Sequence, residues 1–350
     1  MIVREKLPTH TIAQCLNSPM NLDDLVYFRS VDPTHLLRHI DALPERVEAA
    51  WARAQTLALP ESYRAATHVL IAARGDSAIA GELAHYAAPE AALPITLWRR
   101  GHLPAWVNEP TLVIAISFSG NTAETVAVAE AALEHGAHVL TISTGGKLAA
   151  LSGATAWQFT AEGDSRTAVG ELAVLALAAL VKLGAAQDKA AEVAEAVNAL
   201  KAQQANLRAE SPVMKNPAKR MAGQIMNRYA ALFVDDELAP AGRYWQSKIN
   251  QFAKAWAQCI PLTEADHAIQ GSVFPEALVE KYMALWLRGP RPSAQSDAVR
   301  MHFMTSGFNT DFIAASGQSV LAQLLTLAHY GDYVAYYLAM CYGVDPAARV

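Results

Sequence analysis

Residues 111–125, TLVIAISFSGNTAET, decide the fold of this chain. Residues 112–116 form a continuous apolar run, which is typical of a strand buried on both faces of a parallel sheet. Hydroxyl side chains and a glycine follow, and residues 123–133 have the composition of a helix. The pattern therefore predicts a buried strand, a short polar turn and a helix in direct succession.

The polar turn suits a bound anion. The first turn of a helix has unpaired N–H groups and the positive end of the helix dipole, and Gly120 lets the backbone approach a ligand closely. Ser117, Ser119 and Thr122 can donate three hydroxyl hydrogen bonds. Since the stretch holds no Lys or Arg, a small phosphate monoester fits better than a polyphosphate. The alternative is an ordinary turn whose serines bind the backbone and whose helix is capped by Asn121 or Thr122.

Composition excludes several classes of function. At 350 residues the chain is expected to form about two domains, and its net charge of −5 without a basic stripe argues against a nucleic-acid partner. No apolar run reaches the roughly 18 residues that cross a membrane. The three cysteines show no metal-ligand spacing, so neither a metal nor another cofactor is expected. Free thiols, together with an N-terminus that lacks a signal core, predict a cytoplasmic protein.

Strands alternate with helices along the whole chain. In the first half we expect strands at 67–73, 94–98, 112–116, 137–143 and 157–159, and helices at 35–57, 78–87, 123–133 and 169–183. In the second half we expect helices at 218–227, 239–259 and 319–342, and strands at 230–234, 282–287 and 299–303. The alternation predicts α/β architecture with doubly wound, mainly parallel sheets. The shared rhythm of the halves is weak evidence for a duplicated fold.

The turn SFSGNTAET at 117–125 resembles the signature of sugar isomerase (SIS) domains. Within that superfamily the chain is most similar to the bifunctional phosphoglucose/phosphomannose isomerase family. The supporting stretches keep the family's order and spacing, and they are LPE at 43–45, GDSAIAG at 75–81, SRTAVG at 165–170, NPAK at 216–219, the segment 245–254, GDYV at 331–334 and GVDP at 343–346.

The resemblance implies two SIS domains, each a doubly wound, mainly parallel sheet flanked by helices. The expected division is an N-terminal extension at 1–35, a first, phosphosugar-binding SIS domain at 36–185, a helical connector at 186–212 and a second SIS domain at 213–350. The implied activity is aldose–ketose isomerisation of glucose 6-phosphate or mannose 6-phosphate and fructose 6-phosphate. A homodimer that binds a sugar phosphate without a cofactor is expected.

The resemblance also implies site residues. The family places the sugar phosphate on the first domain, which here implicates Gly75, Ser77, Ser117, Ser119 and Thr122. Arg166 is expected near the substrate, where it supplies the cation that the turn lacks. The alternative for Arg166 is a surface residue that caps a loop.

The catalytic positions depart from the family pattern. The family's base is a Glu that directly follows an Asn, whereas Asn250 is here followed by Gln251, whose amide cannot take a proton. Loss of a general base costs about 10²–10⁴ in rate. His267 lies sixteen residues after Gln251, the spacing of the family's ring-opening His, although a structural loop histidine is the alternative. The family's third group is a Lys beyond the match to Asp345, and here the sequence ends four residues after Pro346.

Two hypotheses follow from these departures. The chain is a phosphosugar isomerase, or it is a catalytically impaired protein that binds or senses a sugar phosphate. Four acids are candidate substitutes for the missing base, each with a solvated loop acid as the alternative: Asp235, Asp236, Glu237 and Glu264.

Overall fold

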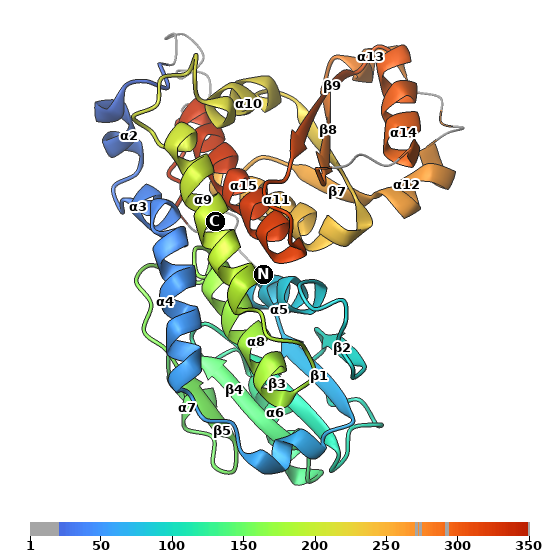
Figure 1. Ribbon diagram of the computed structural model, residues 1–350. Helices are drawn as coiled ribbons and strands as arrows, with labels where there is room; N and C mark the ends of the chain where they lie inside the picture. Colours follow the sequence, from blue (N-terminus) through green and yellow to red (C-terminus); the bar gives the residue numbers. More distant parts are fainter. Residues whose placement is uncertain (1–20, 270–271, 273–274, 291–293, 349–350) are drawn as a thin grey trace, which may run out of the picture.

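The chain folds into two lobes, each built on a parallel sheet (Figure 1). The computed structural model describes residues 21–269, 272, 275–290 and 294–348. The first sheet has five strands in the order β2-β1-β3-β4-β5, and the second has four in the order β7-β6-β8-β9. All strand pairs in the described residues are parallel, which confirms the predicted α/β architecture.

The first sheet forms where apolar runs are buried on both faces. Its strands are β1 (His68–Ala73), β2 (Ile95–Trp98), β3 (Thr111–Ile116), β4 (His138–Ser143) and β5 (Thr155–Gln158). Every residue of β3 is buried. Alternate side chains enter two cores, Ile114 facing one and Val113 the other, so the central strand has no polar face.

Helices cover both faces of this sheet. One face packs against α5 (Gly75–Tyr86) and α8 (Val169–Leu183), with α4 (Leu43–Thr56) behind them, and the other against α6 (Ala123–Glu134) and α7 (Gly146–Ala149). A short 3₁₀ helix, η1 (Glu61–Ala65), precedes β1. The strand–turn–helix succession predicted around residues 111–125 is therefore confirmed as β3, its turn and α6.

The second lobe repeats the arrangement with fewer strands. Its strands are β6 (Tyr229–Val234), β7 (Ala257–Pro261), β8 (Tyr282–Arg288) and β9 (Asn309–Ala314). One face carries α10 (Pro217–Ile225), α11 (Ala239–Phe252) and α15 (Val320–Tyr342). The other carries α12 (Leu262–Ile269) and α14 (Ala294–Thr305), while α13 (Glu276–Val279) precedes β8 and η2 (Asp236–Leu238) precedes α11.

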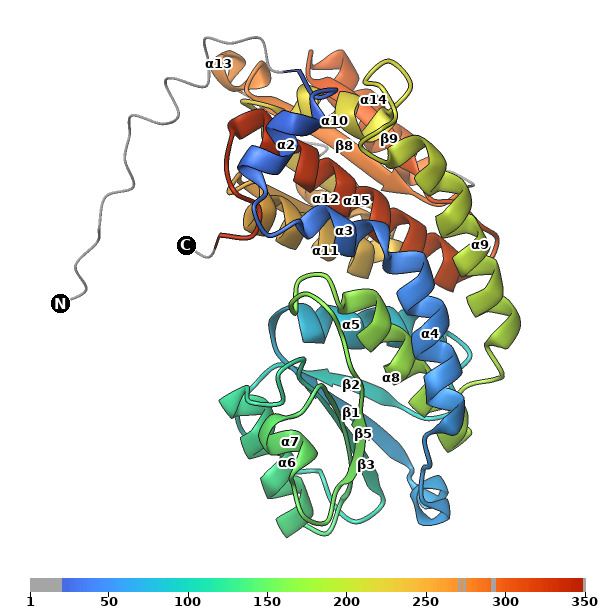
Figure 2. The same ribbon diagram turned by 90° about the vertical axis from the view of Figure 1, so that its left-hand side faces the viewer.

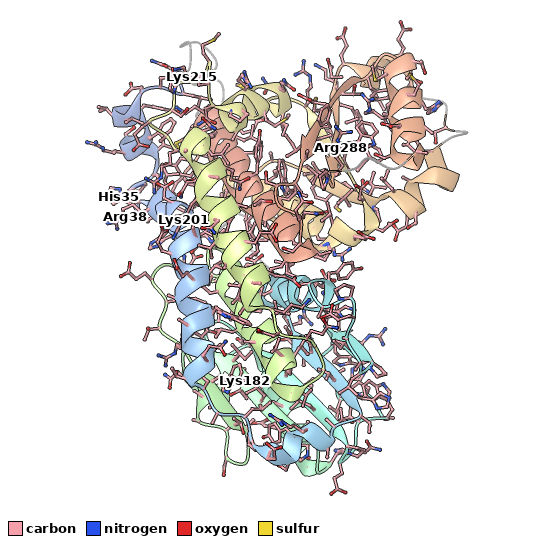
Figure 3. The ribbon with its side chains drawn as sticks, in the orientation of Figure 1. His35, Arg38, Lys182, Lys201, Lys215 and Arg288 are labelled. Atoms are coloured by element: carbon pink, nitrogen blue, oxygen red, sulfur yellow. The ribbon has the colours of Figure 1, made fainter. Side chains whose placement is uncertain are left out.

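One continuous core joins the lobes. It reaches from Ile114 in the first sheet to Leu285 in the second through the helices between them. Figure 2 shows α4 and α9 (Ala190–Leu207) running along the side of the molecule from one lobe toward the other. Lys201 on α9, labelled in Figure 3, reaches Glu48 on α4 with 3.0 Å between Nζ and Oε2.

The described part of the predicted N-terminal extension packs on the body of the same chain. It holds α2 (Leu25–Val31), and α3 (Leu36–Asp41) follows directly. Tyr27 donates its hydroxyl to the carbonyl of Met340, at 2.9 Å, and the Tyr336 hydroxyl donates to Asp32. This segment is thereby fixed to α15.

Three predicted elements were wrong. The helix expected at 35–57 is broken at Ala42, between α3 and α4. The helix expected at 239–259 ends at Phe252, because Lys254 takes a positive φ of 55° and β7 follows. The strand expected at 299–303 lies within the helix α14, whose buried Val299 and Phe303 are one helical turn apart.

Strand β9 was not predicted at all, and it pairs with β8 along its whole length. Arg288, labelled in Figure 3, lies over the Phe312 ring of β9 at 3.9 Å from the centroid.

Across the described residues, none of the helices combines the length and apolar character needed to cross a membrane.

Candidate functional site

A cleft of about 810 Å³ opens at the carboxyl ends of β1 and β3. In the order β2-β1-β3-β4-β5, the chain leaves β1 in one direction and β3 in the other, and doubly wound folds bind ligands at such a switch point. The cleft brings together seven of the eight predicted site residues, namely Gly75, Ser77, Ser117, Ser119, Thr122, Arg166 and Gln251. The last of these comes from α11 of the second lobe, so both lobes line the cleft.

The serine turn presents hydroxyls at the start of α6. Ser117 Oγ and Thr122 Oγ1 are hydrogen-bonded to each other at 2.9 Å, and Thr122 is the N-cap residue of the helix. Ser119 Oγ accepts from the backbone N–H of Asn121 at 3.2 Å, so its hydroxyl hydrogen is left to donate. The turn therefore offers hydroxyl donors beside a helix N-terminus, which is an anion-binding arrangement.

Gly120 is required by the path of this turn. Its φ is +67°, and a Cβ built on it would lie 1.9 Å from the carbonyl oxygen of Gly145. The carbonyl of Gly120 in turn accepts from Leu148 N at 3.0 Å. The turn is thus locked against the loop after β4.

The loop after β1 forms the second wall. Gly75 begins α5 with a φ of +54°, and Ser77 is 7% exposed in the same first turn. Because β1 and β3 are neighbours, this helix start lies at the same edge of the sheet as the serine turn.

Arg166 is buried in the wall of the cleft and is fully engaged. Its guanidinium donates to both oxygens of Asp164, and it also donates to the carbonyls of Pro346 at 3.1 Å and Ala347 at 2.9 Å. The loop before α8 is thereby tied to the C-terminal segment. A second cation, Lys254, donates to the carbonyl of Ala348. Burial lowers the pKa of Lys254, and the charge of Arg166 lowers it further.

Gln251 faces the start of α5 across the cleft. Its Nε2 donates to Ser247 Oγ at 3.0 Å and to Asp76 Oδ1 at 3.3 Å. Asp76 also accepts from Ser247 Oγ at 3.0 Å and pairs with Lys248 Nζ at 3.2 Å. Asp76 lines the cleft and is 9% exposed, whereas Lys248 is fully buried.

Asp76 and Lys248 were not predicted as site residues. Two signals were available: the carboxylate stands directly between Gly75 and Ser77, and the lysine precedes Gln251 by three residues on the same helix. Beyond Lys248 lies a second acid, Asp332, whose two oxygens accept from the Tyr244 hydroxyl at 2.8 and 2.9 Å. Burial raises the pKa of Asp332 to about 7.

The remaining predicted groups are His267 and the four candidate substitute acids. Position 267 falls in α12, and the side chain of His267 lies outside the described residues. None of the four candidate substitute acids, Asp235, Asp236, Glu237 and Glu264, is among the residues that line the cleft. They follow the strand ends of the second sheet, and Asp236 binds Thr263 there at 2.8 Å.

At the equivalent switch point of the second sheet, the described residues include a bound carboxylate. This switch point lies between β6 and β8, where Asp235 Oδ2 accepts from the backbone N–H of Gly289 at 2.8 Å. The protein's own carboxylate occupies the position of an anion there.

The sequence pattern of the bacterial phospho-glucose isomerase C-terminal SIS domain matches residues 214–349. The chain is 29% identical over 317 residues to a bifunctional phosphoglucose/phosphomannose isomerase of Caldicellulosiruptor bescii, covering 87% of this chain and 93% of that protein. It is 28% identical over 290 residues to the protein of the same name from Thermoplasma acidophilum, covering 81% and 88%.

A solved structure shares the fold. The tagatose-6-phosphate ketose/aldose isomerase of Escherichia coli superposes with a TM-score of 0.67 at 15% identity, over 88% of this chain and 93% of that one. The chain thus has the two-lobed fold of phosphosugar isomerases of the SIS type.

Proposed function

We propose, on the premise that this chain resembles the bifunctional phosphoglucose/phosphomannose isomerases, that it is an aldose–ketose isomerase. Its substrates would be glucose 6-phosphate, mannose 6-phosphate and fructose 6-phosphate, which are the sugar phosphates that the family resemblance implies. The observation that carries the proposal is the cleft itself, in which an anion-binding turn of the first lobe faces α11 of the second.

The phosphate would bind at the start of α6. Ser117, Ser119 and Thr122 offer hydroxyl donors there, and the helix dipole favours the negative charge. In an open-chain hexose 6-phosphate, C1 and C2 lie at the end opposite the phosphate. The reacting carbons would therefore extend across the cleft toward Asn250 and Gln251 on α11.

The remaining predicted roles belong to this proposal as well. Arg166 would contribute positive charge to the cleft, although its hydrogen bonds to Asp164 fix it in place. Gly75 and Ser77 would help to bind the sugar phosphate from the start of α5. His267 keeps its predicted role in ring opening as a proposal from sequence spacing alone.

The first test is interconversion of the three sugar phosphates by the purified chain and by Ser119→Ala. The variant loses the hydrogen bond from the Ser119 hydroxyl to the phosphate, and a hydrogen bond to a charged group is worth about 1.5–3 kcal/mol. KM should therefore rise roughly ten-fold or more, while kcat changes little. Ser30→Ala, an exposed serine on α2, is the matched control and should leave both constants unchanged.

The outcome also separates the two hypotheses. Binding of fructose 6-phosphate by calorimetry, without turnover of any of the three sugars, would support the impaired binding protein instead. The comparisons do not favour that alternative, since the relatives carry the names of isomerases.

Three further predictions remain proposals. We propose the division into an extension at 1–35, SIS domains at 36–185 and 213–350 and a connector at 186–212, supported by the two sheets and by α9 between them. We also propose a cytoplasmic homodimer, which light scattering and cell fractionation would test. Among described residues, Cys259 and Cys341 are free thiols, as a reducing compartment requires.

A further inference from the structure

A carboxylate in the cleft lies next to Gln251, which stands where the resemblance leads one to expect the catalytic base. Among the described residues that line the cleft are two acids, Asp76 and Asp164. Arg166 donates to both oxygens of Asp164. Asp76 Oδ1 lies 3.3 Å from Gln251 Nε2, so it is the acid next to the residue that replaces the family's Glu.

We infer that Asp76 is the general base of the proposed isomerisation, and that Ser247, Lys248 and Gln251 position its carboxylate; this inference rests on the proposed function. Asp76 is the second residue of α5, directly after Gly75 at the carboxyl end of β1. That places it beside the phosphate turn and opposite α11.

Lys248 forms a buried ion pair with the Asp76 carboxylate. The lysine side chain is 0% exposed, and a buried ammonium is tolerated only when an opposite charge accompanies it. Its ion pair in the described residues is with Asp76, at 3.2 Å. Burial raises the pKa of the neighbouring Asp332 to about 7, so below that pH Asp332 is mostly neutral and the charge of Lys248 is balanced by Asp76.

The contacts of Asp76 leave one lone-pair site of its carboxylate without a partner among the described residues. An ionised carboxylate has about four lone-pair sites. Three of them are directed at Ser247 Oγ, Gln251 Nε2 and Lys248 Nζ. The remaining site is available to a proton, and the three donors fix the carboxylate in one orientation, as a base needs.

The proton transfer balances within the substrate. Starting from the aldose, Asp76 takes the proton on C2; the C2–H electron pair forms the C1=C2 bond, and the C1=O π pair moves to O1, which gains a proton. The resulting enediol loses the O2 proton, C2=O forms, and Asp76 returns its proton to C1. One oxygen gains the proton that the other loses, so no oxidant or reductant is required.

The simplest structural alternative is that Asp76 only neutralises Lys248 and links α5 to α11. Two variants separate the roles. Asp76→Asn keeps the shape but cannot take a proton, and Asp76→Asn/Lys248→Met removes the buried charge as well. Replacing a buried ion pair by apolar groups is often neutral for stability, so the double variant keeps the test valid if the single one does not fold.

The experiment uses the full chain with fructose 6-phosphate in D₂O and follows both isomerisation and deuterium uptake at C1 by NMR. If Asp76 is the base, both variants lose about 10²–10⁴-fold in kcat and in the exchange rate while their Kd for fructose 6-phosphate stays within three-fold of the parent. Glu109→Gln, at an exposed acid that is not among the residues lining the cleft, should retain full activity.

Two results would overturn the inference in different ways. If the parent is active and the kcat of the double variant lies within three-fold of the parent value, Asp76 only balances the charge of Lys248. The proposed function then stands, but without Asp76 as its base. A parent chain that neither isomerises nor exchanges the sugar hydrogen overturns the proposed function itself, and the inference with it.

Discussion

At the scale of single residues, the phosphate turn depends on the glycine at position 120. A Cβ there would lie 1.9 Å from Gly145 O, and the backbone already has a φ of +67°. We expect Gly120→Ala to cost about 2–5 kcal/mol, from left-handed strain and overpacking together. Because the turn must move away from Gly145, the affinity for fructose 6-phosphate should also fall at least ten-fold. Urea unfolding and calorimetry measure the two effects.

Gly136→Ala is the matched control for this substitution. Gly136 has a φ of +75°, and a Cβ on it would meet nothing within 4 Å. It should therefore lose only about 1–2 kcal/mol and keep the parent affinity. Equal losses in the two variants would mean that the contact with Gly145 does not matter.

Residue types explain why part of the site was predictable. Hydroxyls and a glycine after a buried strand indicate an anion site from local chemistry alone, and the structure brings these residues into one cleft. Asp76 is identified as a site residue by its contacts with Ser247, Lys248 and Gln251, which lie more than 170 residues away in sequence. No local pattern could pair them, because the pairing depends on how the lobes pack.

At the scale of elements, the buried polar contacts of α11 and α15 should make stability depend on pH. The pKa of Asp332 on α15 is about 7 in the folded chain, raised by burial from 3.8. Between pH 4 and 7 the folded state keeps a proton that the unfolded state has lost, so this residue lowers stability as pH rises. The total is roughly 4 kcal/mol, or about three pKa units.

Asp332→Asn tests this dependence, since the amide oxygen can still accept from Tyr244. The free energy of unfolding of the parent minus that of the variant should fall by roughly 4 kcal/mol from pH 4 to 7.5. Burial lowers the pKa of His329 to about 4, which destabilises both proteins as pH falls from 6.5 to 4, and this effect cancels in the difference. A difference that stays constant with pH would contradict the assignment.

Elements were predicted well where the apolar pattern is continuous and poorly where it is mixed. Strand β3 and helix α8 are almost wholly apolar and were predicted correctly. Residues 299–303 alternate in a way that suits a strand, yet Met301 is 54% exposed while Val299 and Phe303 are buried. That spacing of four residues is helical, and the burial that reveals it comes from the sheet beneath α14.

At the scale of the whole molecule, the cleft exists only while α5 of the first lobe packs against α11 of the second. Acids lie on α5 and bases on α11: Glu82 binds Arg243 at 2.8 Å, as Asp76 binds Lys248 at 3.2 Å. Glu82 also binds Arg99 at 2.6 Å. The contact between α5 and α11 is therefore charged and partly buried, so its charges should matter more than those on the surface.

Glu82→Gln tests this contact, and Glu48→Gln provides the comparison. The Glu82 side chain is 5% exposed and faces two arginines, so removing its charge should cost about 2–3 kcal/mol, below the 3–5 kcal/mol of a fully buried pair because the arginines are partly solvated. Glu48 pairs with Lys201 at a similar distance but is 62% exposed, so its loss should cost less than about 0.5 kcal/mol. Urea unfolding at two salt concentrations measures both, and similar costs for the two variants would show that the lobes are held together by apolar packing alone.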